Sequence, residues 1–260
     1  MSAHSLIGAS TIKRLIACPG SLRLALAIAA DAKPGRAGRS VYAARGTAAH
    51  ALGEEALRNG YDPIAEIGAT VNVDGHDITV DETMVRALRV YVAEVKARTG
   101  EGAWWALETR VTLDPYWRDG TRPPVPAFGT ADCISYHENA MHLDVIDYKN
   151  GSGVFVDAFE NPQLFYYAAG ALLFAPGPVA TVDLTIVQPN VRGKDHVRTY
   201  QTTAVDVLMW VEDTLKPAIA LATTPDAPLS AGKHCQFCPA ERDCPALVRK
   251  SLDQARRDFA

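Results

Sequence analysis

The segment 142-HLDVIDYKNG-151, together with 128-FGTADCISYHENAM-141 before it, decides the fold. Both segments are short, rich in β-branched and aromatic residues, and bounded by Gly or Asn. This composition predicts two strands joined by a turn near 137-HENA-140. We therefore expect a β-hairpin at the centre of the molecule.

Charged side chains lie within these expected strands. Side chains alternate along a strand, so Asp147 and Lys149 project from one face, and Asp132 in the preceding strand comes to lie near Asp147. Two neighbouring carboxylates repel unless a cation lies between them, and hard oxygen ligands favour Mg²⁺ or Mn²⁺. Asp-x-Lys is common by chance, however, and alone it favours a salt bridge or two solvent-facing side chains.

The rest of the chain alternates between helical and strand-like patterns. The order predicts an α/β (α+β) fold, in which a small mixed sheet is flanked by helices. An N-cap at Asn161 and Pro162 at the first helical position mark one helix start. Helices are expected over 21–32, 46–60, 81–100, 161–174 and 204–222, the last interrupted by a proline, and strands over 104–113, 128–138, 141–150 and 179–190.

Composition bounds the class of protein. The 260 residues are 48% apolar and 22% charged, which suits one globular domain over residues 1–260. The chain has no apolar run of roughly 18 residues that would suggest a membrane span. Its start lacks the apolar stretch of a secretory signal, so we expect an intracellular protein, in the cytoplasm of a bacterial or phage-infected cell.

Charge is distributed unevenly. The net charge is −4, but residues 1–45 hold seven Lys or Arg against one acid, and residues 232–260 hold six against four. A basic N-terminal segment over 1–45 is therefore either a solvated loop around residues 31–40 or a phosphate-contacting element.

Three of the five cysteines form a C-x₂-C-x₅-C set within a C-terminal element over 232–248: Cys235, Cys238 and Cys244. Three thiols this close are typical of a metal or cluster site. Cys18, also followed by proline, is a candidate fourth ligand, whereas Cys133 reads as a small buried strand residue. Zn²⁺ bound by the three with His234 or Cys18 is the rival interpretation, although adjacent residues such as His234 and Cys235 seldom both reach one tetrahedral centre.

Several motifs in order resemble the RecB-type branch of the PD-(D/E)XK nucleases. They are RGTAAHALGE with His50, FGTAD with Asp132, VIDYKNG with Asp147 and Lys149, and NPQLFYYAAG with Gln163 and Tyr167. The resemblance extends from about residue 10 to residue 248. One departure is that the Pro-Asp of the family name is here Ala131-Asp132, although Gly129 to Asp132 fits the Gly-x-x-Asp of the RecB branch.

The resemblance implies a restriction-endonuclease-like core and a divalent-metal-dependent DNA nuclease, an exonuclease in recombination or repair of phage or prophage type. It implies that the metal is bound by His50, Asp132, Asp147 and the backbone carbonyl of Tyr148, that Lys149 assists the attacking water, and that Gln163 and Tyr167 lie beside the site and the DNA. Glu108 resembles an acid often found on the preceding strand, but an ion pair with Arg110 or another base explains it equally well.

A thiol upstream of the core and three downstream resemble the iron–sulfur subgroup of these nucleases, which includes AddB. The resemblance implies a [4Fe–4S] cluster held by Cys18, Cys235, Cys238 and Cys244, which joins the N- and C-terminal segments. The expected partners are DNA and other recombination proteins, such as a single-strand annealing protein or a helicase, and no membrane. The alternatives are a non-catalytic DNA-binding or recombination partner that keeps the fold and the cluster, and a structural zinc module.

Overall fold

The computed structural model describes residues 5–31, 40–117, 120 and 122–258. The chain divides into two compact units. We call the first the terminal unit (Met1–Arg36, Thr112–Gly129 and Val207–Ala260) and the second the sheet unit (Ala37–Val111 and Thr130–Asp206). The single domain expected over residues 1–260 stays a prediction.

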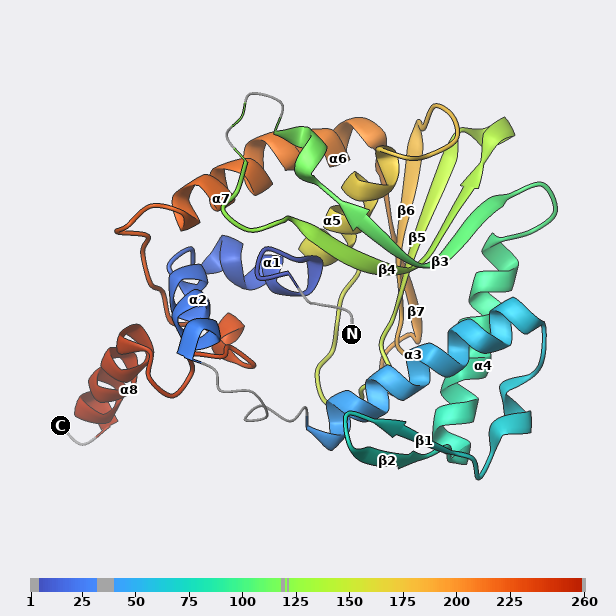
Figure 1. Cartoon of the computed structure of the whole chain (residues 1–260), viewed down its shortest axis with the longest axis horizontal. Coiled ribbons are helices and arrows are strands. Elements are labelled where there is room, and N and C mark those ends of the chain that lie inside the picture. Colours follow the sequence, from blue (N-terminus) through green and yellow to red (C-terminus); the bar gives the residue numbers. More distant parts are fainter. Residues whose placement is uncertain (1–4, 32–39, 118–119, 121, 259–260) are drawn as a thin grey trace. The chain divides into compact units, whose positions relative to one another are not determined.

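Five strands form the sheet, in the spatial order β3-β4-β5-β6-β7 (Figure 1). They are β3 (Trp104–Thr112), β4 (Phe128–His137), β5 (His142–Tyr148), β6 (Thr181–Val187) and β7 (Val197–Thr203). β5 is antiparallel to β4 and parallel to β6, and β6 is antiparallel to β7, so the sheet is mixed. The predicted hairpin is confirmed, with the 3₁₀ turn Glu138–Ala140 between β4 and β5.

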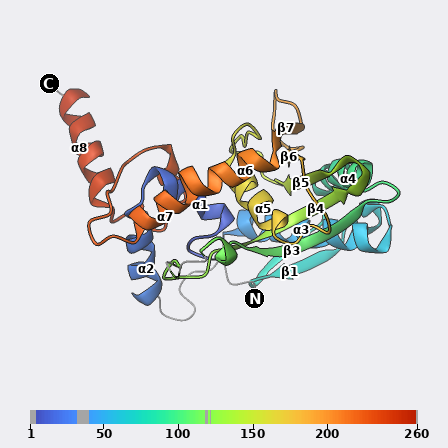
Figure 2. The same ribbon diagram turned by 90° about the horizontal axis from the view of Figure 1, so that it is seen from above.

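Helices contact the central strands β5 and β6. The helix α5 (Pro162–Leu172) carries the chain from β5 to the parallel strand β6, a connection that a tight turn cannot make. The helix α4 (Glu82–Arg98) contacts the same two strands, and α3 (Val41–Asn59) packs on α4, as Figure 2 shows from above. The prediction of a mixed sheet flanked by helices is therefore confirmed.

The core of the sheet unit follows the predicted amphipathic pattern of α4. Its buried residues are spaced at three and four positions: Met84, Val85, Ala87, Leu88, Tyr91, Val92 and Val95. All of them except Val92 join buried residues of α3 and, from β5, Ile146 and Tyr148 in one apolar cluster. The start of α5 is also as predicted, since the Asn161 side chain accepts a hydrogen bond from the Gln163 amide at 3.0 Å.

Two strand regions were not predicted. The first is the hairpin of β1 (Thr70–Val73) and β2 (His76–Thr79), which contacts α3. Its turn, Asp74-Gly75, has both residues at positive φ, and Asp-Gly is a known hairpin signal. The second is the edge strand β7, which is polar and half-exposed, so it lacks the apolar pattern of a buried strand.

The terminal unit is helical. It holds α1 (Ala9–Ala17), α2 (Ser21–Asp31), α7 (Lys216–Ala222), α8 (Pro245–Asp258), and the 3₁₀ helices Asp114–Tyr116 and Lys233–Cys235. The helix α6 (Ala204–Trp210) continues through a π-helical turn, Val211–Leu215, into α7, whose second residue is Pro217. Because proline has no amide hydrogen, it explains the predicted interruption.

The N-terminal helices of the terminal unit are bound to the segment that precedes the C-terminal cysteines. The Gly20 amide donates to the Pro228 carbonyl at 2.9 Å, and Arg23 donates to the Pro225 carbonyl at 2.8 Å. In the described ranges, no helix has both the length and the apolar character needed to cross a lipid bilayer.

Candidate metal centre

His50 on α3, Glu108 on β3 and Asp132 on β4 bring ligand atoms to one place. The Nδ1 atom of His50 lies 3.3 Å from Asp132 Oδ1 and 3.6 Å from Glu108 Oε1. All three ligand atoms lie within 4.8 Å of one another. One imidazole and two carboxylates at this spacing are a donor set that divalent cations bind.

Glu108 adopts an unusual backbone conformation. Its φ is 45° in the middle of β3, a region that residues with a side chain rarely adopt. Such strain persists where the surrounding structure enforces it, and it is concentrated at functional sites. Glu108 pairs with His50, so it belongs to the centre, and the sequence pattern alone could not have decided this.

A second group of polar side chains lies around Asp147 at the end of β5. Lys149 Nζ lies 3.0 Å from Asp147 Oδ1 and donates to Gln163 Oε1 at 3.1 Å. The side-chain nitrogen Nε2 of Gln163 in turn lies 3.2 Å from Asp147 Oδ1 and 3.0 Å from the Tyr167 hydroxyl. The predicted acid, lysine and Gln-x-x-x-Tyr residues therefore form one hydrogen-bonded network.

Asp132 and Tyr148 join the two groups. Cys133 pairs with Ile146 across the β4–β5 ladder, and continuing this register by one residue sets Asp132 opposite Asp147. The Tyr148 amide donates to Asp132 Oδ2 at 2.6 Å. The Tyr148 ring, whose centroid is 5.3 Å from that of His50, fixes the strand end against α3. All the predicted catalytic and divalent-metal residues thus lie in one region of the sheet unit.

The pKa values of His50 and Asp147 reflect the negative charge of the neighbouring carboxylates. Burial alone would lower the pKa of His50, but attraction to Asp132 and Glu108 outweighs burial and raises this pKa to about 10. Burial raises the pKa of Asp147 to about 6, and repulsion by Asp132 adds to the effect although Lys149 opposes it. The imidazolium of His50 therefore supplies the positive charge that the carboxylates require.

The residues present fit a divalent cation. Asp147 is buried, and its Oδ2 atom accepts no hydrogen bond from the described residues, although the Lys149 ammonium lies 2.8 Å away. A buried carboxylate oxygen without a hydrogen bond is costly. The His50 imidazole and the carboxylates of Glu108 and Asp132 lie within ligand distance of one another, and the buried Asp147 carboxylate lies beside Asp132, so this oxygen-rich set suits Mg²⁺ or Mn²⁺.

A second cluster with metal-ligand chemistry is better explained as an ion-pair network. His142, Asp144 and Asp183 bring ligand atoms within 4.8 Å of one another. However, the Arg98 guanidinium lies 2.7 Å from Asp144 and 3.2 Å from Asp183, and 2.6 Å from Glu94. The Arg98 guanidinium stays protonated and contacts both Asp144 and Asp183, whereas a histidine can lose its proton and become a ligand, so the His50 group is the better candidate for a metal.

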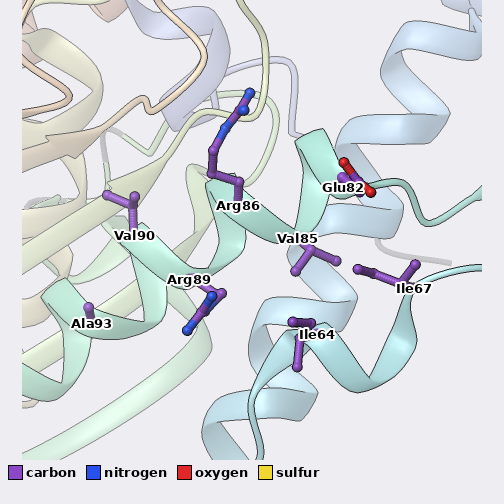
Figure 3. A pocket seen from close by; sticks show the side chains of 8 residues that line it. All are labelled: Ile64, Ile67, Glu82, Val85, Arg86, Arg89, Val90 and Ala93. Atoms are coloured by element: carbon purple, nitrogen blue, oxygen red, sulfur yellow. The ribbon is translucent and has the colours of Figure 1, made fainter.

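A hollow on the surface of the sheet unit lies away from this chemistry. It has a volume of about 790 Å³ and is lined by α4 and the segment Pro63–Glu66 with Ile67 (Figure 3). Its walls combine apolar side chains such as Ile64 and Val85 with Arg86 and Arg89. None of the predicted site residues lines it, so its size does not identify the functional site.

The predicted cluster ligands line one pocket in the terminal unit. Cys18, Cys235, Cys238 and Cys244 surround a space of about 10 Å³. The amides of Ser230 and Gly232 approach the sulfurs of Cys18 and Cys235, both at 3.4 Å. Among the described residues, however, no three of these sulfurs lie within 4.8 Å of one another, and the cluster stays a prediction.

The remaining sulfur and histidine predictions are also placed by the structure. Cys133 is fully buried in the core of the sheet unit, as expected, and burial raises its pKa to about 12. The Nε2 atom of His234 lies 2.9 Å from the Ser230 carbonyl oxygen, so binding a metal through this atom would require breaking that contact. Of the basic N-terminal segment, Lys33, Arg36 and Arg39 lie outside the described residues.

Gln188, which directly follows β6 and is 1% exposed, was not predicted from the sequence. Its side chain donates to the carbonyls of Gly151 and Val154 at 3.0 and 2.8 Å and accepts from the Val156 amide at 3.1 Å. It thus fixes the segment between Lys149 and α5. A glutamine directly after the buried apolar residues Ile186 and Val187 was the available signal, because buried amides need partners.

Comparison with protein families gives one match over nearly the whole chain. The family model described as "Protein of unknown function (DUF2800)" matches residues 4–260. The chain therefore belongs to the DUF2800 family.

Proposed function

We propose that this DUF2800 protein is a divalent-metal-dependent DNA nuclease of the PD-(D/E)XK superfamily, an exonuclease that hydrolyses phosphodiester bonds in recombination or repair. One observation carries the proposal: His50 on α3, Asp132 on β4 and the Asp147–Lys149–Gln163 network lie together where the β4–β5 ladder ends. The order of these residues along the chain resembles the RecB-type motifs.

The chain's own residues define how the metal would act. His50, Asp132, Asp147 and Glu108, with the Tyr148 carbonyl, would hold Mg²⁺ or Mn²⁺, which supplies Lewis-acid stabilisation of the charge that develops on the scissile phosphate. Glu108 adds a ligand to the set that the motifs alone imply, because its carboxylate and that of Asp132 both lie close to the His50 imidazole.

Lys149 is suited to act as a cation rather than as a base. Burial alone would lower its pKa, but Asp147 and Asp132 outweigh burial and raise it, so the ammonium persists at neutral pH. It can orient the attacking water and stabilise negative charge on the phosphate. Gln163 holds Lys149 and Asp147 in fixed positions and is itself braced by Tyr167.

Metal binding is expected to release about one proton per ion at neutral pH. With a pKa of about 10, His50 is protonated at pH 7.5 and must lose its proton to become a ligand. Affinity is therefore expected to fall with decreasing pH below about 10, where His50 is protonated, and more steeply below about 6, where Asp147 also takes up a proton. Titration calorimetry with Mn²⁺ in buffers of different ionisation enthalpy measures the release. The His50→Asn variant is the control, and equal heats for the wild type in all buffers would contradict the assignment.

The second cofactor in this proposal is a [4Fe–4S] cluster bound by Cys18, Cys235, Cys238 and Cys244. It would covalently join the two ends of the chain through the pocket that these cysteines line, and so stabilise the terminal unit. Basic residues from both ends would lie near it, which suits a DNA partner.

Anaerobically purified protein is expected to be brown, with broad visible absorption and four irons per chain. Cys238→Ser is expected to lose the colour and most of the iron, whereas Cys133→Ala keeps both because Cys133 lies in the core of the sheet unit. Colourless wild-type protein that contains stoichiometric zinc would replace the cluster with a zinc site.

A further inference from the structure

We propose that residues 151–160, here called the aromatic loop, form with Lys194 and Arg198 a surface that binds the unpaired nucleotides of a DNA strand next to the metal centre. The inference rests on the proposed function, since it names the form of DNA that the site would accept.

The aromatic loop exposes apolar side chains although its backbone is held in place. Val154, Phe155 and Phe159 are 42%, 40% and 62% exposed. Gln188 binds the loop backbone, and the Arg198 guanidinium donates to the Val156 carbonyl at 2.7 Å. A fixed segment that presents aromatic rings to solvent loses hydrophobic stabilisation, and such patches mark binding sites.

Positive charges lie over one of these rings. The Lys194 ammonium is 5.4 Å and the Arg198 guanidinium carbon 4.7 Å from the centroid of the Phe155 ring. Acidic groups are also present: the carboxylates of Asp157 and Asp195 lie close enough to the Arg198 guanidinium to attract it, so this surface carries charges of both signs. Phe159 is supported from the sheet by Tyr200, at 5.1 Å between ring centroids.

A single strand of DNA matches both features. Its bases can stack on exposed aromatic rings, while its phosphates pair with the neighbouring Lys and Arg side chains. An apolar peptide would cover the rings but would bring no anionic group to Lys194 and Arg198, whereas a nucleic-acid strand brings both bases and phosphates. Bases inside a duplex are already stacked, so the rings would select unpaired nucleotides.

The loop leads directly to the proposed catalytic residues. It begins two residues after Lys149 and ends just before Asn161, the N-cap of α5, which carries Gln163. Asn150 fixes the first end of the loop. Its side-chain oxygen accepts a hydrogen bond from the Tyr148 hydroxyl at 3.1 Å, and its backbone carbonyl accepts one from the Asn190 side chain at 2.8 Å. A strand that stacks on the loop would therefore be held beside Asp147 and Lys149.

Binding is tested without cleavage, in the full-length Asp147→Asn variant. Fluorescence anisotropy measures the affinity for a labelled oligonucleotide of roughly 12 nucleotides, single-stranded or in a duplex. Phe155→Ala and Phe159→Ala are each expected to weaken single-strand binding about 10-fold and to change duplex binding less than about 2-fold. Phe155→Trp keeps the stacking surface and is expected to keep the affinity. Phe174→Ala, a similarly exposed ring on another segment, is the matched control.

Other results would overturn the inference. Unchanged single-strand affinity in both alanine variants would show that the rings serve another ligand, such as a protein partner. An equal loss for duplex DNA, or an equal loss in Phe174→Ala, would show that the rings do not select unpaired bases. Because cleavage is not the readout, a wild type that hydrolyses DNA with unaltered Phe155→Ala binding would refute only this inference. A selective binding loss with an inactive wild type would refute only the nuclease.

Discussion

Replacing Asp147 with asparagine is expected to lower DNA hydrolysis in Mn²⁺ by about 10³-fold, equivalent to about 4 kcal/mol of transition-state stabilisation. Asp147 is buried, and its Oδ2 atom, 2.8 Å from the Lys149 ammonium, accepts no hydrogen bond from the described residues, so we propose that a metal ion shares this oxygen with Lys149. Asparagine keeps the shape of the side chain but removes the negative charge. Initial rates on end-labelled DNA at saturating Mn²⁺ measure the effect.

The matched control is Asp77→Asn, an exposed acid on β2, which is expected to leave the rate within about 2-fold of wild type. Both variants should retain cooperative thermal unfolding, which separates loss of chemistry from loss of fold. An Asp147→Asn protein that is folded and cleaves DNA at the wild-type rate would remove Asp147 from the metal centre.

Replacing Lys149 with methionine is expected to lower the rate constant for hydrolysis about 10²-fold to 10³-fold while Mn²⁺ binding stays close to wild type. The lysine contacts Gln163 and the proposed ligand Asp147, but its ammonium is a cation and cannot itself bind the metal, so its proposed role is in stabilising charge and orienting water. Methionine keeps the apolar stem and removes the charge. Single-turnover rates and Mn²⁺ titration calorimetry on the same protein separate the two effects.

Lys96→Met, on α4, serves as the control for removal of a lysine charge and should behave as wild type. Parallel loss of Mn²⁺ affinity and rate in Lys149→Met would mean that the lysine only maintains the geometry of Asp147. In that case its proposed contact with the reacting groups would be withdrawn.

Much of the centre could be predicted from the sequence because its spacing follows directly from regular secondary structure. Strand alternation places Asp147 and Lys149 on one face, and helix periodicity places Gln163 and Tyr167 together, and the structure has both contacts. The hairpin turn set the register that brings Asp132 to Asp147. These rules depend only on residues close together in the sequence, and no long-range contact overrides them at these positions.

The parts that escaped prediction depend on long-range contacts or on irregular backbone. Glu108 reaches His50 through a left-handed φ inside a strand, which no pattern of residue types announces. Because the edge strand β7 is only partly buried, its sequence has no alternating apolar pattern, and its strand conformation depends on pairing with β6. The aromatic loop is fixed by Gln188, which lies about 30 residues further along the chain.

The most direct test of the account is hydrolysis of end-labelled and circular DNA, single- and double-stranded, by purified, cluster-loaded wild-type protein and by its Asp132→Asn variant. Asp132 is the residue that contacts both His50 and the Tyr148 amide, so its charge links both halves of the centre. The account predicts that the wild type degrades at least one linear substrate in Mn²⁺ or Mg²⁺, that chelation by EDTA stops it, and that the variant is inactive. A wild type that binds DNA in the presence of metal but cleaves none of these substrates, or a variant that cleaves them equally well, would contradict it.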